Sequence, residues 1–69
     1  MINKFNDIMY STLHWSLPRY HGHINDIFED IQTNKLEDDY VIYYEEFSKD
    51  KMPYDILVEY RDKKFKYNK

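Results

Sequence analysis

At 69 residues the chain can build one small hydrophobic core, and a domain of this size buries only roughly 60% of the surface that its unfolded chain exposes. It has no Cys and one Gly, which excludes a disulfide framework, a Cys-based zinc site and the Gly-rich loops that bind nucleotide phosphates. The net charge is −3 and the pI about 5.5, whereas nucleic-acid-binding domains are usually strongly basic. Direct binding of nucleic acid is therefore not expected.

Membrane insertion and secretion are not expected either. No stretch approaches the roughly 18 consecutive apolar residues of a membrane span. The N-terminal stretch contains Asp7 and lacks the apolar run of a secretory signal. The absence of Cys fits a reducing compartment, and the richness in Asn, Lys, Ile, Tyr and Asp is typical of an AT-rich genome. We expect a cytoplasmic protein of a low-GC bacterium, or of the host cell if a phage encodes it.

The first half of the chain predicts two helices. Apolar residues recur at helical spacing over residues 3–16, although the alternation of Leu13, Trp15 and Leu17 also fits a short strand. Pro18 begins a connector because proline disfavours a helical conformation in the residue before it. The second helix is predicted for residues 23–34, where the pattern is clearest: Ile24, Ile27, Phe28 and Ile31.

Two segments of the second half favour strands. Residues 40–47 and 54–60 are rich in β-branched and aromatic residues. The second segment alternates, which would place Ile56 on one face of a strand and Leu57 on the other. The polar connector over residues 48–53 is too short for a crossover helix, so the pair is predicted to form an antiparallel hairpin.

The predicted fold class is α+β, with two N-terminal helices followed by an antiparallel β-hairpin. Residues 1–69 form a single small domain. The basic end, residues 63–69, is expected to fray or to continue the second strand through Phe65 and Tyr67. Gly22, within the connector, is the residue that can take a positive φ at low cost.

The second predicted helix carries an acidic face opposite its apolar one, formed by Asp26, Glu29, Asp30 and Thr33. Like charges at this spacing destabilise a helix by a few tenths of a kcal/mol per pair. A partner explains them more easily than stability does, although a solvated charged face is the plain alternative. A surface helix face excludes no water, so no catalytic residue is assigned.

Three histidines are candidate metal ligands. His21 and His23 flank Gly22, and His14 lies upstream. Histidine and acidic residues can bind zinc, but an isolated H-x-H without a closing set of ligands favours loop packing or helix capping. No metal and no cofactor is assigned.

The run LPRYHGHINDIFEDI, residues 17–31, resembles the barstar family of intracellular ribonuclease inhibitors, which carries an L-P-x-Y-x-G loop followed by an acidic helix. The resemblance extends over about residues 6–47. It implies that Tyr20, Asp26 and Asp30 plug the active site of a nuclease in place of RNA phosphates. The sequence departs from the family in three ways: the opening strand has no counterpart, Glu29 replaces an aromatic residue, and the tail is short for the last helix and strand.

These observations favour a small non-enzymatic inhibitor, of the immunity type or phage-encoded, whose acidic helix face occludes a basic groove by mimicking phosphates. The expected partner is a protein, a nuclease or another nucleic-acid-handling enzyme, with no membrane contact; a homodimer is left open. The residues assigned to partner binding are Tyr20, Asp26, Glu29, Asp30 and Thr33. The alternative is an assembly protein that self-associates through tyrosine-rich strands. The eight Tyr and Trp15 fit either core bulk or interface residues.

Overall fold

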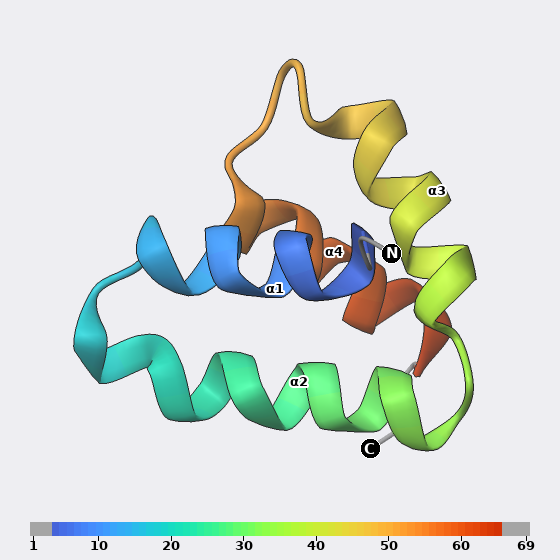
Figure 1. Ribbon diagram of the computed structural model, residues 1–69, viewed down its shortest axis with the longest axis horizontal. Helices are drawn as coiled ribbons and strands as arrows, with labels where there is room; N and C mark the ends of the chain where they lie inside the picture. The colour runs from blue at the N-terminus through green and yellow to red at the C-terminus, as the bar shows by residue number, and fades with distance from the viewer. Residues whose placement is uncertain (1–3, 66–69) are drawn as a thin grey trace.

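The computed structural model describes residues 4–65, which form four α-helices and one 3₁₀ turn and contain no strand. The elements in chain order are α1 (Lys4–His14), η1 (Pro18–Tyr20), α2 (His21–Thr33), α3 (Glu37–Phe47) and α4 (Pro53–Lys64). Figure 1 shows α1 and α2 side by side and antiparallel, with α3 at the end where α2 leads into it and α4 behind α1. Each helix contacts the other three. The fold class is all-α, and the α+β prediction is wrong.

The two helices predicted for the first half of the chain are confirmed. α1 buries Phe5, Ile8 and Thr12, which recur at helical spacing. It continues to His14, so the alternative of a short strand across residues 13–17 is wrong. α2 buries the whole predicted apolar stripe, which consists of Ile24, Ile27, Phe28 and Ile31.

Side-chain hydrogen bonds close the C-terminal end of α1. Ser16 Oγ donates to the carbonyl of Thr12 at 2.7 Å. His21, the first residue of α2, donates from Nε2 to the carbonyl of Leu13 at 2.9 Å. The last carbonyls of a helix have no partner within it, so these bonds satisfy the end of α1 and tie the start of α2 to it.

The backbone differs from the prediction at Gly22. Leu17 is extended, with φ −68° and ψ 144°, as expected before Pro18. Gly22 lies in the first turn of α2, and its φ is not positive. Within residues 4–65 the positive φ belongs to Lys35, at 58°. The left-handed residue therefore follows α2 instead of preceding it.

Lys35 ends α2 in a Schellman motif. The N–H of Leu36 donates to the carbonyl of Ile31 at 2.9 Å, and the N–H of Lys35 donates to Gln32 at 3.0 Å. This pair of bonds requires a left-handed residue at the position of Lys35, where glycine is the usual occupant. Leu36 then packs against the core, and α3 begins at Glu37.

The hairpin predicted for residues 40–47 and 54–60 is wrong because both segments are helical. α3 begins with three acids, which interact favourably with the positive end of the helix dipole. Its inward side chains recur with the helical period, and they are Tyr40, Val41, Tyr43, Tyr44 and Phe47. The side chains that would have covered a strand therefore pack into a helical core.

α4 begins at Pro53, a first helical position that suits proline because its missing N–H is not needed there. Ile56, Leu57 and Tyr60 are fully buried. A strand would have separated Ile56 from Leu57, whereas a helix turns adjacent residues by only about 100°, so both reach the same core. Three cations occupy the last turn, where the helix dipole favours them.

The basic end predicted for residues 63–69 lies only partly in the described chain. Its first two lysines belong to the last turn of α4, and Phe65 follows as the C-cap, so this part is helical. Residues 66–69, which include Tyr67 of the predicted strand extension, lie outside the described residues, as does residue 3 of the first predicted helix.

One aromatic ring from each helix meets at the centre of the domain. The ring of Tyr40 packs edge-on against Phe5, Phe28 and Tyr60, with centroids 6.2, 5.8 and 4.9 Å apart. Phe5 and Phe28 also meet edge-on at 5.5 Å. Such pairs contribute about 0.5–1.5 kcal/mol beyond their buried area. We call these four rings the aromatic core.

The two tyrosines of the aromatic core differ in the hydrogen bonding of their hydroxyl groups. Tyr60 Oη donates to Asp39 Oδ2 at 2.7 Å, at the edge of the core. The Tyr40 hydroxyl is buried and has no partner among the described residues. Burial raises the pKa of the Tyr40 hydroxyl. A buried hydroxyl without a partner costs about 1–3 kcal/mol.

We expect Lys35→Gly to raise the free energy of unfolding by about 1 kcal/mol, because glycine adopts the left-handed conformation without the steric cost of a Cβ atom. In a domain of this size that gain corresponds to roughly 4–8 °C in melting temperature, measured by circular dichroism. Lys35→Ala is the control, since it removes the same side chain and keeps Cβ. An equal gain in both variants would show that the lysine side chain, and not its backbone conformation, limits stability.

Tyr40→Phe should raise the free energy of unfolding by about 1 kcal/mol, because it removes a buried hydroxyl that makes no hydrogen bond. Tyr60→Phe should lower it by about 1 kcal/mol, because it breaks a hydrogen bond to a carboxylate. Urea denaturation measures both. A loss in Tyr40→Phe as large as that in Tyr60→Phe contradicts the unpaired state of the Tyr40 hydroxyl.

Candidate functional site

The residues of α2 predicted to bind a partner form one outward stripe, which we call the acidic stripe: Asp26, Glu29, Asp30 and Thr33. Three of them are exposed and Asp30 is partly buried. With a rise of about 1.5 Å per residue the stripe is about 10 Å long. The opposite side of α2 is fully buried, so the inner face fixes the helix while the acids face water.

Asp26 and Glu29 form no ion pair and no side-chain hydrogen bond with any of the described residues. Like charges three residues apart repel by a few tenths of a kcal/mol. The lysines that form ion pairs do so with acids of α3 and α4; they are Lys4, Lys51 and Lys64. Within residues 4–65, these two acids therefore have no cation at ion-pair distance.

Tyr20 lies beside the N-terminus of α2 and outside the acidic stripe. It ends η1, is 37% exposed, and packs against Tyr54 of α4 with ring centroids 5.4 Å apart. The guanidinium of Arg19 lies 5.5 Å from the centre of the Tyr20 ring. The stripe begins at Asp26, about 9 Å further along the helix axis. The structure thus places Tyr20 about 9 Å before the stripe and holds it against α4.

The three histidines make three separate contacts. His21 caps the C-terminal end of α1, and capping was one of the roles expected for the His21 and His23 pair. His23 Nε2 accepts from Arg61 at 3.3 Å, because a guanidinium can only donate. His14 packs edge-on against Trp15. Within residues 4–65 no group of three His, Asp or Glu side chains could hold a metal ion.

Asp39, at the start of α3, belongs to a different cluster from the acidic stripe. It accepts from Tyr60 Oη, and Lys64 Nζ lies 3.3 Å from its carboxylate. The hydrogen bond from Tyr60, together with Lys64, holds the pKa of Asp39 below its ordinary value of 3.8. Burial, reinforced by Asp39, raises the pKa of Tyr60. These contacts join the start of α3 to the end of α4.

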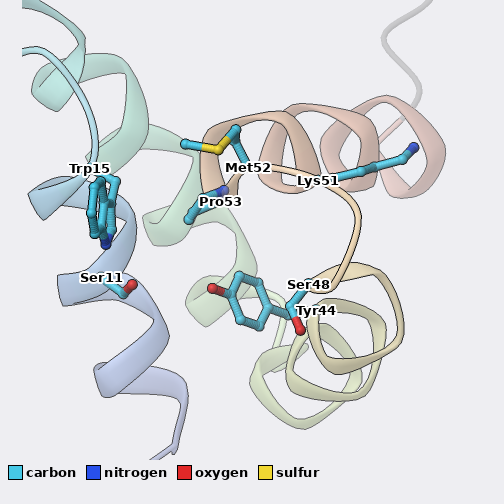
Figure 2. A pocket seen from close by; sticks show the side chains of 7 residues that line it. All are labelled: Ser11, Trp15, Tyr44, Ser48, Lys51, Met52 and Pro53. Atoms are coloured by element: carbon cyan, nitrogen blue, oxygen red, sulfur yellow. The ribbon is translucent and has the colours of Figure 1, made fainter.

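A pocket of about 330 Å³ lies between the C-terminal ends of α1 and α3 and the start of α4. Trp15 and Met52 line it (Figure 2). Trp15 is 65% exposed and Met52 is 54% exposed. The other lining residues are Ser11, Tyr44, Ser48, Lys51 and Pro53. Sequence reasoning missed this pocket. The signal that could have pointed to it was a lone tryptophan directly after the apolar pattern of the first helix.

The inward polar groups of the pocket are hydrogen-bond donors that have no partner among the described residues. They are the indole N–H of Trp15 and the hydroxyls of Ser11 and Tyr44. Lys51 is the one charged residue of the lining, and Figure 2 shows its ammonium group directed away from the pocket. There it donates to Glu59 at 2.7 and 2.8 Å.

No family model, curated protein or solved structure matches the chain. The resemblance of residues 17–31 to the barstar family therefore stays a prediction that rests on those residues alone. None of the described helices is long and apolar enough to cross a membrane.

Asp39→Asn should flatten the loss of stability in acid. Because the pKa of Asp39 is lower in the folded than in the unfolded chain, its carboxylate stabilises the fold above about pH 4, and this contribution disappears as the pH falls below 3.8. The side chain is 46% exposed, so solvent screening limits the effect to at most about 1 kcal/mol. Urea denaturation over a series of acidic pH values measures the slope.

Asp38→Asn is the matched control for Asp39→Asn. Asp38 lies in the same first turn of α3, is exposed and forms no ion pair within residues 4–65. The control should keep the acid dependence of the wild type. Equal flattening in both variants would show that the helix dipole, and not the contacts of Asp39, produces it.

Proposed function

We propose that this protein is a non-enzymatic inhibitor that inserts the acidic stripe of α2 into a basic groove of a nuclease or another nucleic-acid-handling enzyme. Tyr20 would contact the target beyond the N-terminal end of the stripe. The observation that carries the proposal is the exposure of Asp26 and Glu29 on a firmly packed helix, with no ion pair to either acid among the described residues. Proteins contact nucleic-acid phosphates largely through Arg and Lys, and such cations would attract the stripe.

The dimensions of the stripe support mimicry of a phosphate backbone. Asp26 and Asp30 are separated by about 6 Å of helix rise. Successive phosphates of one DNA strand advance about 3.4 Å along the duplex. The whole stripe, about 10 Å long, therefore spans roughly three phosphate steps. Because the carboxylates stand on a helix that is already ordered, binding would order little backbone and lose little entropy.

Electrostatics would act mainly on the rate of encounter. Complementary charge steers two proteins together and raises the association rate constant, and salt screens this attraction. We therefore expect the association rate with the target to fall as ionic strength rises. The affinity would come from those contacts within the groove that exclude water.

Self-association through tyrosine-rich strands, the alternative function, requires strands that the described chain does not form. Residues 40–47 and 54–60 are helical. Tyr40 and Tyr60 are fully buried in the aromatic core and are not available to a second chain.

The proposal predicts that neutralising the acidic stripe abolishes capture of the target. Immobilised wild-type protein is exposed to a low-GC bacterial lysate beside two variants of equal charge, both checked for helix content by circular dichroism. The stripe variant carries Asp26→Asn, Glu29→Gln and Asp30→Asn. The control variant neutralises three exposed acids outside α2 and carries Asp7→Asn, Glu46→Gln and Asp50→Asn.

The wild type and the control variant should retain the same nucleic-acid-handling enzyme, and the stripe variant should retain about tenfold less or lower still. Added nucleic acid should displace that enzyme from the wild type, and the wild type should inhibit the purified enzyme. Retention by the stripe variant, or no competition by nucleic acid, would refute the proposal.

A further inference from the structure

We infer that the pocket beside Trp15 binds an uncharged peptide segment of a partner protein, with one large apolar side chain as its anchor. This site is separate from the acidic stripe, because α2 contributes no residue to its lining. It lies where the ends of α1 and α3 meet the start of α4 (Figure 2). Exposed apolar walls and unpaired polar groups between them make up the site.

Trp15 and Met52 are apolar walls that folding leaves uncovered. Trp15 is 65% exposed although it is the only tryptophan of the chain, and Met52 is 54% exposed. The same chain buries a ring from each of its four helices in the aromatic core. Trp and Met are enriched at the centres of protein interfaces. A small domain that leaves both in water presents a surface suited to a partner.

The exposed area fits a short segment better than a second copy of this domain. An aromatic side chain has about 150–250 Å² of surface, so Trp15 leaves on the order of 100–160 Å² open. Only part of that area, with part of the exposed surface of Met52, lines the pocket. Each partner of a standard stable interface contributes about 800 Å². A helix or extended peptide can instead bind through a few anchor side chains in a small groove.

The polar groups determine the chemistry of the segment. Figure 2 shows the indole nitrogen of Trp15 at the end of its ring nearest Ser11, and the hydroxyl of Tyr44 turned toward α1. The indole N–H can only donate, and the two hydroxyls can donate as well as accept, so all three unpaired groups can bind the backbone carbonyls of a peptide. The ammonium group of Lys51 is paired with Glu59 outside the pocket, so the lining offers no charge to a charged anchor. An apolar side chain flanked by peptide carbonyls is the matching occupant.

The test uses the fluorescence of Trp15, which is the only tryptophan of the chain and therefore reports on the pocket itself. Random short peptides displayed on phage are selected against the full chain, and the enriched sequences without tryptophan are synthesised as probes. Met52→Glu places a charge on the wall of the pocket. Ile42→Glu is the matched control, because Ile42 is also an exposed apolar residue, at 67%, but lies on α3 outside the pocket.

We expect the enriched peptides to share one aromatic or large aliphatic residue and to shift the emission of Trp15 to shorter wavelength. Affinity should fall at least about tenfold in Met52→Glu and stay unchanged in Ile42→Glu. The stripe variant of α2 should bind the peptides as the wild type does, which separates this inference from the proposed function.

Three results overturn the inference. One is the absence of any enriched peptide, and another is equal affinity for wild type and Met52→Glu. The third is a second copy as occupant, seen when sedimentation shows dimerisation that shifts Trp15 emission without peptide and is lost in Met52→Glu.

Discussion

The edge-on packing of the Tyr40 ring against Phe5, Phe28 and Tyr60 is the interaction that joins all four helices. A chain of 69 residues can bury only a few side chains. Because the four rings are large, they fill the centre of the domain with few residues. Truncating one buried ring to alanine costs about 3–5 kcal/mol, a large part of the 5–15 kcal/mol that stabilises a typical domain. The position of every helix, and so of each candidate surface, depends on this cluster.

Periodicity alone could predict the first two helices, whereas residue types misled the prediction for the second half. Residues 40–47 and 54–60 are rich in types that favour strands, but that preference reflects fit to neighbouring side chains. Here the neighbours are rings on other helices. Signals at the helix ends pointed the other way: acids at the start of α3, Pro53 at the start of α4 and cations at its end. The strand signal lay in the middle of each segment.

The candidate surfaces differ in how far the sequence could predict them. The acidic stripe depends on one helix only: once Ile24 and Ile27 face the core, Asp26 must face outward. The pocket depends on the meeting of three segments far apart in sequence, and their arrangement follows from the aromatic core. The left-handed residue was missed for a related reason. Glycine is the residue type expected there, but the end of α2 requires this conformation of a lysine.

Magnitudes show that folding explains neither surface. Burying a large apolar side chain contributes about 1.5–3 kcal/mol, so the four buried residues of α2 far outweigh the few tenths of a kcal/mol lost to repulsion between Asp26 and Glu29. These charges thus have almost no influence on whether α2 forms. Trp15 differs from these acids because its exposure affects stability. Leaving its ring in water loses the stabilisation that burial would give, and a domain this small has few other large side chains to bury. Each surface is therefore neutral or unfavourable in the isolated chain, and a partner that covered it would make it stabilising.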